Sequence, residues 1–223
     1  MSVARAMASF VGKSDMPPGE LARRVGRGAR SAVGVHGFQL GGFIVEGGKS
    51  DSDRVSPLVA RLNFPNEWRF VLVIPTDSKG RHSDAERAAF EKLSPIPHAV
   101  TADLCRLTLL GMLPAIAERD FQAFSESLFE FGTKVGECFS SSQGGVYASP
   151  LAGAVVETCR RHGIRGVAQS SWGPTLVAVS DSRFHAEWLA ARLRDSLATA
   201  SIETMCVTAN NLGARTDVLG ITS

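Results

Sequence analysis

Apolar residues follow two different spacings along the chain. Residues 68–74 (WRFVLVI) are apolar at nearly every position and are followed by Pro75, which is typical of a strand buried on both faces of a sheet. Further on, apolar side chains recur every three or four positions over residues 101–137, which predicts helices. The apolar stripe changes face near Arg119 and Asp120, so we expect a central strand followed by two helices that divide there.

Shorter patterns precede the central strand. Residues 20–25 predict a short helix, and residues 42–46 and 54–63 predict strands. Residues 1–15 show little periodicity, and they predict no regular element.

The segments after residue 75 mix helices, loops and strands. A helix is expected over residues 83–93, where Ser83 is the N-cap and Glu86 its capping-box partner. Residues 140–145 are expected to form a flexible loop. The remaining elements are, in order, a helix (150–162), two strands around a turn (163–179), a helix (182–198) and a strand (202–208). This order predicts an α+β fold in which helices pack on an antiparallel sheet.

The pattern also suggests where the chain divides. Pro95 and Pro97 interrupt it, and the periodicity becomes helical beyond them. With 223 residues, 44% of them hydrophobic, the chain is long enough for one large domain or two small ones. We expect two, at residues 1–97 and 98–223.

Composition limits the partners and the compartment. The net charge is +2 and 21% of the residues are charged, so the chain lacks the basic field that nucleic-acid binding requires. It has no run of about 18 consecutive apolar residues and no clear signal-peptide pattern at its start. We therefore expect a cytoplasmic protein with no nucleic-acid or membrane partner. No CxxC pair occurs, so buried free thiols are expected at Cys105, Cys138, Cys159 and Cys206.

A glycine- and arginine-rich segment, GRGARSAVG, carries the first candidate site. Its candidate ligand-binding residues are Gly26, Arg27, Gly28, Arg30 and Ser31. Glycines let the backbone approach a ligand, and a helix starting near Ser31 would add unpaired N–H groups and a positive dipole end. These features favour a phosphate ligand. A glycine-rich turn with solvated arginines is the alternative, and the segment alone does not separate the two.

A second segment, residues 166–175 (GVAQSSWGPT), combines small polar residues with one aromatic side chain. The two segments together resemble the glycine-rich motifs of the beta-ribofuranosylaminobenzene 5'-phosphate synthases, a branch of the GHMP kinase superfamily. Further agreement lies in GGFIVEGG (41–48), FP (64–65), WRFV (68–71) and ERAAF (86–90). The likeness runs over most of residues 20–215, and QSSWGPT is its most specific part.

The resemblance implies both a fold and a reaction. The fold is a GHMP-kinase-like two-layer architecture with an incomplete N-terminal domain (1–97) and a C-terminal-type α+β domain (98–223). The reaction condenses phosphoribosyl pyrophosphate with 4-aminobenzoate or 4-hydroxybenzoate, with loss of CO2 and pyrophosphate, in tetrahydromethanopterin biosynthesis. Arginines, backbone amides and Mg²⁺ would stabilise the leaving group. Departure of CO2 restores aromaticity, so the step needs no dedicated general base.

The resemblance also assigns roles to residues. The phosphate-binding residues would be Gly26, Arg27, Gly28, Arg30 and Ser31, with the Ser31 hydroxyl also near Mg²⁺. The facing wall would consist of Gln169, Ser170, Ser171 and Trp172. Trp172 would stack on the aromatic acid, or else pack within its hairpin. The catalytic residues are unknown, and His36 and His82 are candidates for polar contacts or ordinary structural histidines.

Two features depart from the family pattern. Ala168 stands where the family favours glycine, which matters only if the turn needs a positive φ. Family members carry more sequence upstream, so the N-terminal half is expected to be less well packed, swapped between copies or completed by a partner. A homodimer is left open. So are two alternatives to the synthase: a GHMP-type small-molecule kinase, and an impaired relative that acts by binding or assembly.

Overall fold

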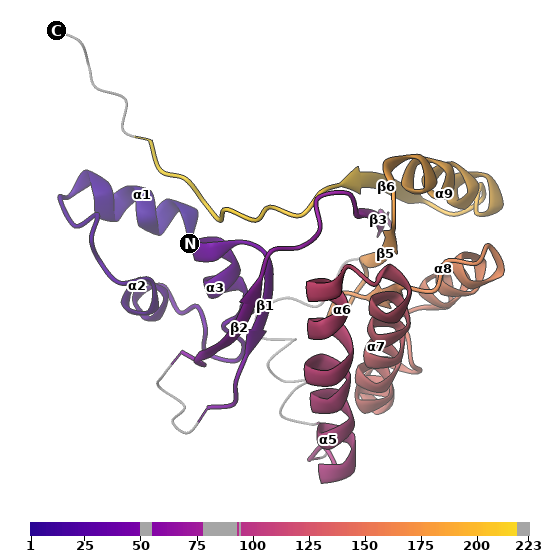
Figure 1. The fold of residues 1–223 in the computed structure, drawn as a ribbon, viewed down its shortest axis with the longest axis horizontal. Helices are drawn as coiled ribbons and strands as arrows, with labels where there is room; N and C mark the ends of the chain where they lie inside the picture. The colour runs from indigo at the N-terminus through magenta and orange to yellow at the C-terminus, as the bar shows by residue number, and fades with distance from the viewer. Residues whose placement is uncertain (50–54, 78–92, 94, 218–223) are drawn as a thin grey trace, which may run out of the picture. The chain divides into compact units, whose positions relative to one another are not determined.

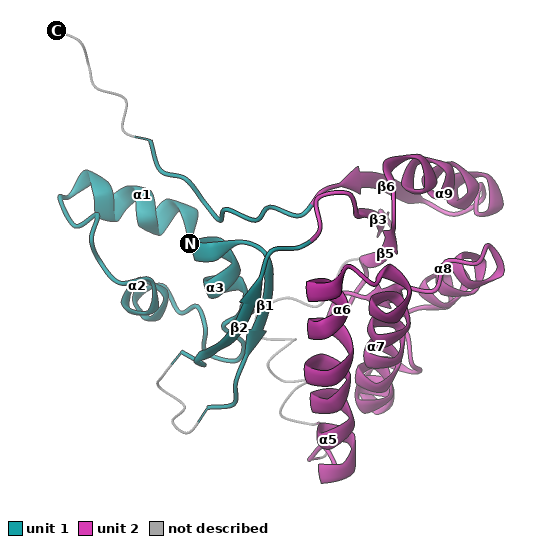
Figure 2. Cartoon of the chain, in the orientation of Figure 1, with its two compact units in different colours: residues 1–64, 209–223 teal, residues 65–208 magenta. Residues whose placement is uncertain are grey.

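A computed structural model of the protein describes residues 1–49, 55–77, 93 and 95–217 (Figure 1). The chain forms two compact units, residues 1–64 with 209–223 and residues 65–208 (Figure 2). The helix expected over residues 83–93, with Ser83 and Glu86, lies outside the described residues except for residue 93.

The second unit is built on a four-stranded antiparallel sheet. Its strands are β3 (Arg69–Pro75), β4 (Val167–Gln169), β5 (Leu176–Ser180) and β6 (Ile202–Val207). The strand order is β4-β5-β3-β6, with Val71 of β3 opposite both Ala178 and Cys206. The prediction of an interior strand from its continuous apolar run is confirmed, because β3 has a partner on each side.

Two helices cover one face of this sheet. They are α8 (Pro150–Arg161) and α9 (Arg183–Ser196), which lie side by side on the same side of the strands (Figure 1). Buried apolar side chains from both helices and from β3, β4 and β5 form the core, among them Val71, Val155, Leu176, Leu189 and Leu193. The hairpin of β4 and β5 and both helices were expected from the sequence, and they are confirmed.

The predicted helical stretch after residue 97 contains a break where expected. A continuous helical run comprises α5 (His98–Arg106), the π-helical segment η1 (Leu107–Met112) and α6 (Leu113–Glu118). Arg119 then adopts a left-handed conformation (φ 60°), and the Asp120 carboxylate caps α7 (Phe121–Gln143) by accepting the Ala123 N–H at 2.9 Å.

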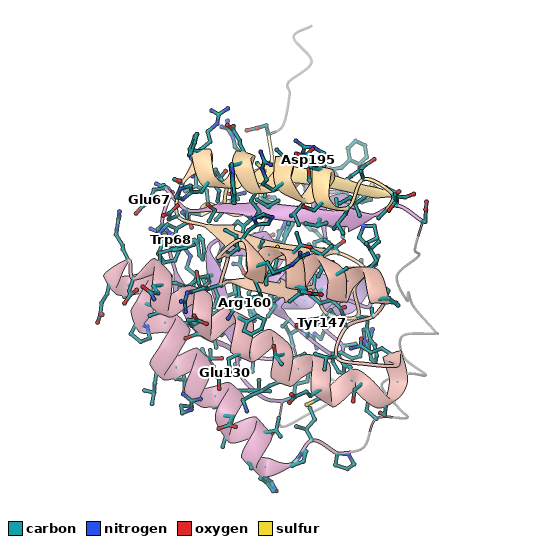
Figure 3. The ribbon with its side chains drawn as sticks, turned by 90° about the vertical axis from the view of Figure 1, so that its right-hand side faces the viewer. Glu67, Trp68, Glu130, Tyr147, Arg160 and Asp195 are labelled. Carbon is teal, nitrogen blue, oxygen red and sulfur yellow. The ribbon has the colours of Figure 1, made fainter. Side chains whose placement is uncertain are left out.

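Ion pairs and rings attach these helices to their neighbours. Lys134 of α7 pairs with Asp103 at 2.8 Å, and this contact lowers the pKa of the Asp103 carboxyl. Glu130, which is labelled in Figure 3, lies on α7 and pairs with Arg106 at 3.2 Å. The Trp68 ring, just before β3, lies 5.2 Å from the Phe121 ring. The helices are thus fixed to one another and to the start of the central strand.

The helical run His98–Glu118 is, by length and composition, apolar enough to cross a membrane. Its apolar side chains are divided between two environments: Leu107, Met112 and Ile116 are buried, whereas Leu109 and Leu110 are exposed. Its charged residues near the start pair with α7 in the folded unit. The run therefore serves as a packed helix of the second unit.

The first unit combines short helices with a two-stranded sheet in its described residues. Its helices are α1 (Ser2–Phe10), α2 (Pro18–Arg24) and α3 (Val33–Leu40). Strands β1 (Phe43–Glu46) and β2 (Leu58–Leu62) pair antiparallel, with Phe43 opposite Leu62. The helix α1 was missed, and its apolar residues Val3, Met7 and Phe10 are exposed.

The division of the chain differs from the boundary expected at residue 97. The strand β3 belongs with the second unit because its partners, β5 and β6, come from residues after 170. The last segment belongs with the first unit: the Asn211 side chain accepts the Phe64 N–H at 2.8 Å and donates to the Phe64 carbonyl at 2.9 Å. Contacts between residues far apart in the sequence therefore decide where the chain divides into two units.

Two further expectations were wrong. The loop expected at residues 140–145 is helical as far as Gln143, and the chain turns only at Gly144, where φ is 87°. All four cysteines are free, but Cys105 and Cys206 are exposed. Cys159 is buried, and this burial raises the pKa of its thiol to about 12.

Candidate functional site

The arginine- and glycine-rich loop in the first unit leads into α3. Gly26 and Gly28 have positive φ (66° and 79°), as a tight loop requires. The helix begins at Val33, two residues after Ser31, so the start expected near Ser31 is confirmed; Ser31 itself lies outside the helix, and its Oγ accepts the Val33 N–H at 3.3 Å. The preceding Ala32 N–H donates to the Glu46 carboxylate. Two amides that were expected to be unpaired therefore already have protein acceptors.

Two charged residues at the end of β1 brace this loop. Glu46 holds the Ala32 amide, and the Lys49 ammonium donates to the Gly28 carbonyl at 2.9 Å and to the Ala29 carbonyl. They flank Gly47 and Gly48, so one short segment binds the loop at both of its ends. The sequence reasoning did not single them out. Opposite charges on either side of a glycine pair after a strand were the available signal.

The arginines of the loop differ in their surroundings. The Arg27 guanidinium lies against the start of α3, since a Cβ added at Gly34 would be 3.7 Å from its Nη2. Arg30 is exposed. The loop thus presents positive charge beside a helix start whose first two amides are already bound by Glu46 and Ser31.

We expect Glu46→Ala to destabilise the first unit by about 1–3 kcal/mol, since it leaves the amide of fully buried Ala32 without its acceptor. Urea unfolding monitored with amide exchange at Ala32 measures this. The control is Glu157→Ala, because Glu157 is exposed and its ion pair is with Arg161, one helical turn away. Equal stability of the two variants would contradict the bracing role.

The second candidate segment, in the other unit, is held by two interlocked amide side chains. Gln169 accepts the Ala148 N–H at 2.7 Å through Oε1 and donates to the Ser171 carbonyl at 3.0 Å. Gln143 donates to the Val146 carbonyl at 2.8 Å, and the two amides meet at 3.4 Å. Gln169 therefore fixes two loops, residues 144–149 and 170–175, and its partner Gln143 was missed by the sequence reasoning.

The turn itself exposes small hydroxyls and buries its aromatic ring. Ser170 and Ser171 are exposed, and Ser171 has a positive φ of 52°. Trp172 is only 5% exposed and stacks on Phe139, with ring centroids 4.4 Å apart and planes 16° apart. Trp172 therefore packs on α7 and not within its own hairpin, and its contact with an aromatic acid stays a prediction. Ala168 lies in β4 with an ordinary φ, so the turn does not need glycine there.

The two candidate segments belong to different units. Gly26, Arg27, Gly28, Arg30 and Ser31 lie in the first unit, and Gln169, Ser170, Ser171 and Trp172 lie in the second. Their meeting around one ligand stays a prediction. His36 Nε2 is 2.8 Å from the Ser56 carbonyl, which is a structural contact, and His82 lies outside the described residues.

A magnesium ion has limited protein ligation in the described part of the chain. No group of three or more His, Cys, Asp or Glu side chains gathers there. Ser31 and Glu46 nevertheless have side-chain oxygen atoms at the start of α3, where each accepts a backbone N–H. Mg²⁺ is often held by one or two protein oxygens together with substrate phosphates, and a magnesium site at Ser31 stays a prediction.

The layered sheet and helices define the class of protein. The family model for the GHMP kinases C terminal matches residues 112–199. Mevalonate diphosphate decarboxylase from Staphylococcus aureus superposes with a TM-score of 0.62 at 16% identity, over 89% of this chain and 60% of that one. A putative homoserine kinase from Listeria monocytogenes gives 0.58 at 17% identity, over 96% and 65%. The protein therefore has a GHMP-kinase-like fold, as expected.

Curated relatives narrow the class to a family. A protein of Archaeoglobus fulgidus named beta-ribofuranosylphenol 5'-phosphate synthase is 32% identical over 236 residues, covering 98% of this chain and 70% of its own length. The protein of the same name from Methanothermobacter thermautotrophicus is 31% identical over 196 residues. The chain belongs to the beta-ribofuranosylphenol 5'-phosphate synthase family. It spans 58% of the length of the Methanothermobacter protein.

Proposed function

We propose that the protein is a synthase that condenses phosphoribosyl pyrophosphate with 4-hydroxybenzoate or 4-aminobenzoate, releasing CO2 and pyrophosphate, in tetrahydromethanopterin biosynthesis. The observation that carries the proposal is the match to the Archaeoglobus protein over 98% of this chain. A ribosylphenol 5'-phosphate, the product in that protein's name, is what 4-hydroxybenzoate would give after losing CO2. The name therefore favours 4-hydroxybenzoate over 4-aminobenzoate.

The bond changes of this reaction balance without a further reactant. Pyrophosphate leaves the anomeric carbon with the bonding electron pair, and the ring carbon that bears the carboxylate attacks this carbon. The C–C bond to the carboxylate then breaks, CO2 departs, and its electrons restore the aromatic ring. The protein's main task is to bind and stabilise the developing diphosphate charge, for which Arg27 and Arg30 are suited.

Two accompanying features belong to the same proposal. Mg²⁺ would neutralise charge on the diphosphate, with Ser31 and Glu46 as its protein oxygens. The reaction would take place in the cytoplasm.

The direct test supplies carboxyl-labelled 4-hydroxybenzoate, phosphoribosyl pyrophosphate and Mg²⁺ to the purified protein. Labelled CO2 without added ATP supports the synthase, and omission of phosphoribosyl pyrophosphate should abolish it. ATP turnover in place of CO2 release would identify a small-molecule kinase instead.

A second candidate function is binding or assembly without turnover. It is favoured by the exposed apolar stripe Val3, Met7, Phe10 and Val11 on one unit. Absent CO2 release from a sample that still binds phosphoribosyl pyrophosphate would support this function over the synthase.

We expect Arg30→Ala to weaken phosphoribosyl pyrophosphate binding by about 1.5–3 kcal/mol, as for loss of a charged hydrogen-bonding group. Isothermal titration measures the change. Arg192→Ala is the control, because Arg192 is an exposed arginine in the other unit whose Asp195 contact is 4.0 Å long. Equal affinities for the two variants would remove Arg30 from the site.

A further inference from the structure

The first unit contains a pocket at the end of α3, the helix whose start follows the arginine- and glycine-rich loop. Its volume is about 270 Å³, and it opens between the turn after α1, the end of α3 and the C-terminal segment. The lining residues that matter for its chemistry are Arg5, Asp15, Met16, Phe38, Gln39 and Thr216. All of them belong to one unit, so the pocket does not depend on how the two units are placed.

Backbone contacts hold the pocket walls together. The Ala214 N–H donates to the Phe38 carbonyl at 2.7 Å, which fixes the C-terminal segment to the end of α3. Gly213 has a φ of 72°, and a Cβ there would lie only 2.4 Å from the Gln39 carbonyl oxygen. The segment is therefore packed against α3 as closely as a backbone allows.

Arg5 forms the charged side of the pocket. Its Nη1 donates to the Ser14 carbonyl at 2.8 Å and to the Met16 carbonyl at 3.0 Å, so the guanidinium lies against the turn that lines the pocket. Within the described residues, Nη2 and Nε have no acceptor. The Arg5 guanidinium is fixed by these two hydrogen bonds and keeps two donor groups, so it is suited to bind a carboxylate.

The rest of the lining suits the other parts of a small aromatic acid. Asp15 has no donor partner in the described part of the chain, and its carboxylate can accept a hydrogen bond from a ligand. Phe38 and Met16 offer ring and thioether contacts. Benzene occupies a cavity of about 150 Å³ in an engineered protein, so about 270 Å³ holds one ring with its substituents.

We propose that this pocket binds a single-ring carboxylate that also carries a hydrogen-bond donor, with its carboxylate on Arg5 and its donor on Asp15. This inference rests on the proposed function, because its substrates 4-hydroxybenzoate and 4-aminobenzoate are single-ring carboxylates that carry such a donor. It assigns the acid to the first unit and not to Trp172, whose ring is buried against Phe139.

The test compares 4-hydroxybenzoate with benzoate, which lacks the second donor, by isothermal titration against the full chain. Asp15→Asn is expected to weaken 4-hydroxybenzoate binding about tenfold, and to leave benzoate binding no weaker. Asp15 is exposed, and it makes no hydrogen bond or ion pair within the described residues that the substitution would remove. Asp195→Asn, an exposed aspartate of α9 in the other unit, should change neither affinity.

A second variant fills the pocket without altering its charges. Ala214→Leu adds apolar volume to the lining and is expected to weaken binding of both acids. Its circular dichroism spectrum and unfolding midpoint establish that it folds.

The outcomes distinguish failure of the proposed pocket from failure of the proposed synthase function. If neither acid binds, or if both variants bind 4-hydroxybenzoate as the wild type does, the pocket is not the acid site. CO2 release by Ala214→Leu with an unchanged KM for the acid would overturn the pocket while the synthase function stands. Binding that is sensitive to Asp15→Asn without CO2 release would support the pocket and overturn the synthase.

Discussion

Leu189→Ala is expected to lower the free energy of unfolding of the second unit by about 2–5 kcal/mol. Leu189 is 0% exposed and lies in the core that α8 and α9 form on the sheet. Truncation removes apolar contacts and leaves a cavity that rigid strands on the other side cannot fill. Urea unfolding measures the loss.

The same helix supplies the control for this prediction. Phe184 is 74% exposed at the start of α9, so Phe184→Ala should change stability by no more than about 0.5 kcal/mol. A similar loss for both variants would mean that α9 does not pack as described.

Gly213→Ala is expected to release the C-terminal segment from α3. A side chain at a φ of 72° costs about 1–2 kcal/mol by itself. The added Cβ would also lie 2.4 Å from the Gln39 carbonyl oxygen and 2.9 Å from the Leu40 nitrogen. Because backbone cannot give way as a flexible side chain does, the total loss should exceed the conformational cost alone.

Gly12 provides a matched control, since it has the same φ of 72° and nothing within 4 Å of an added Cβ. Gly12→Ala isolates the conformational cost, and the difference between the variants gives the cost of the clash. Urea unfolding measures the stability of each variant. Limited proteolysis of residues 209–217 shows whether the C-terminal segment is released. If Gly12→Ala is as damaging as Gly213→Ala, close packing of the segment is not important.

Much of the second unit could be predicted because its signals are local. Strand β3 is apolar on both faces, and the break at Arg119 with its Asp120 cap follows a change in the apolar stripe. By contrast, α1 was missed although Val3, Met7 and Phe10 follow helical spacing; these side chains are exposed, and Ala8 is the buried residue of the helix. The helix is held partly by Arg5, through hydrogen bonds to carbonyls beyond the helix end.

The candidate sites were harder to predict because their details depend on distant partners. The Glu46 carboxylate reaches an amide fourteen positions away, and Phe139 covers Trp172 from another helix. Neither contact leaves a spacing pattern in the sequence. Local composition identified the glycine-rich segments, but it did not show which amides and rings were already occupied.

The bond between Asn211 and Phe64 has a consequence for the order of folding. The second unit is continuous in sequence, whereas the first contains residues from both sides of it. During synthesis from the N-terminus, residues 65–208 can emerge and pack before the last segment exists. The ribosome must therefore release residue 211 before the first unit can close, so the unit whose synthesis begins first is the last to be completed.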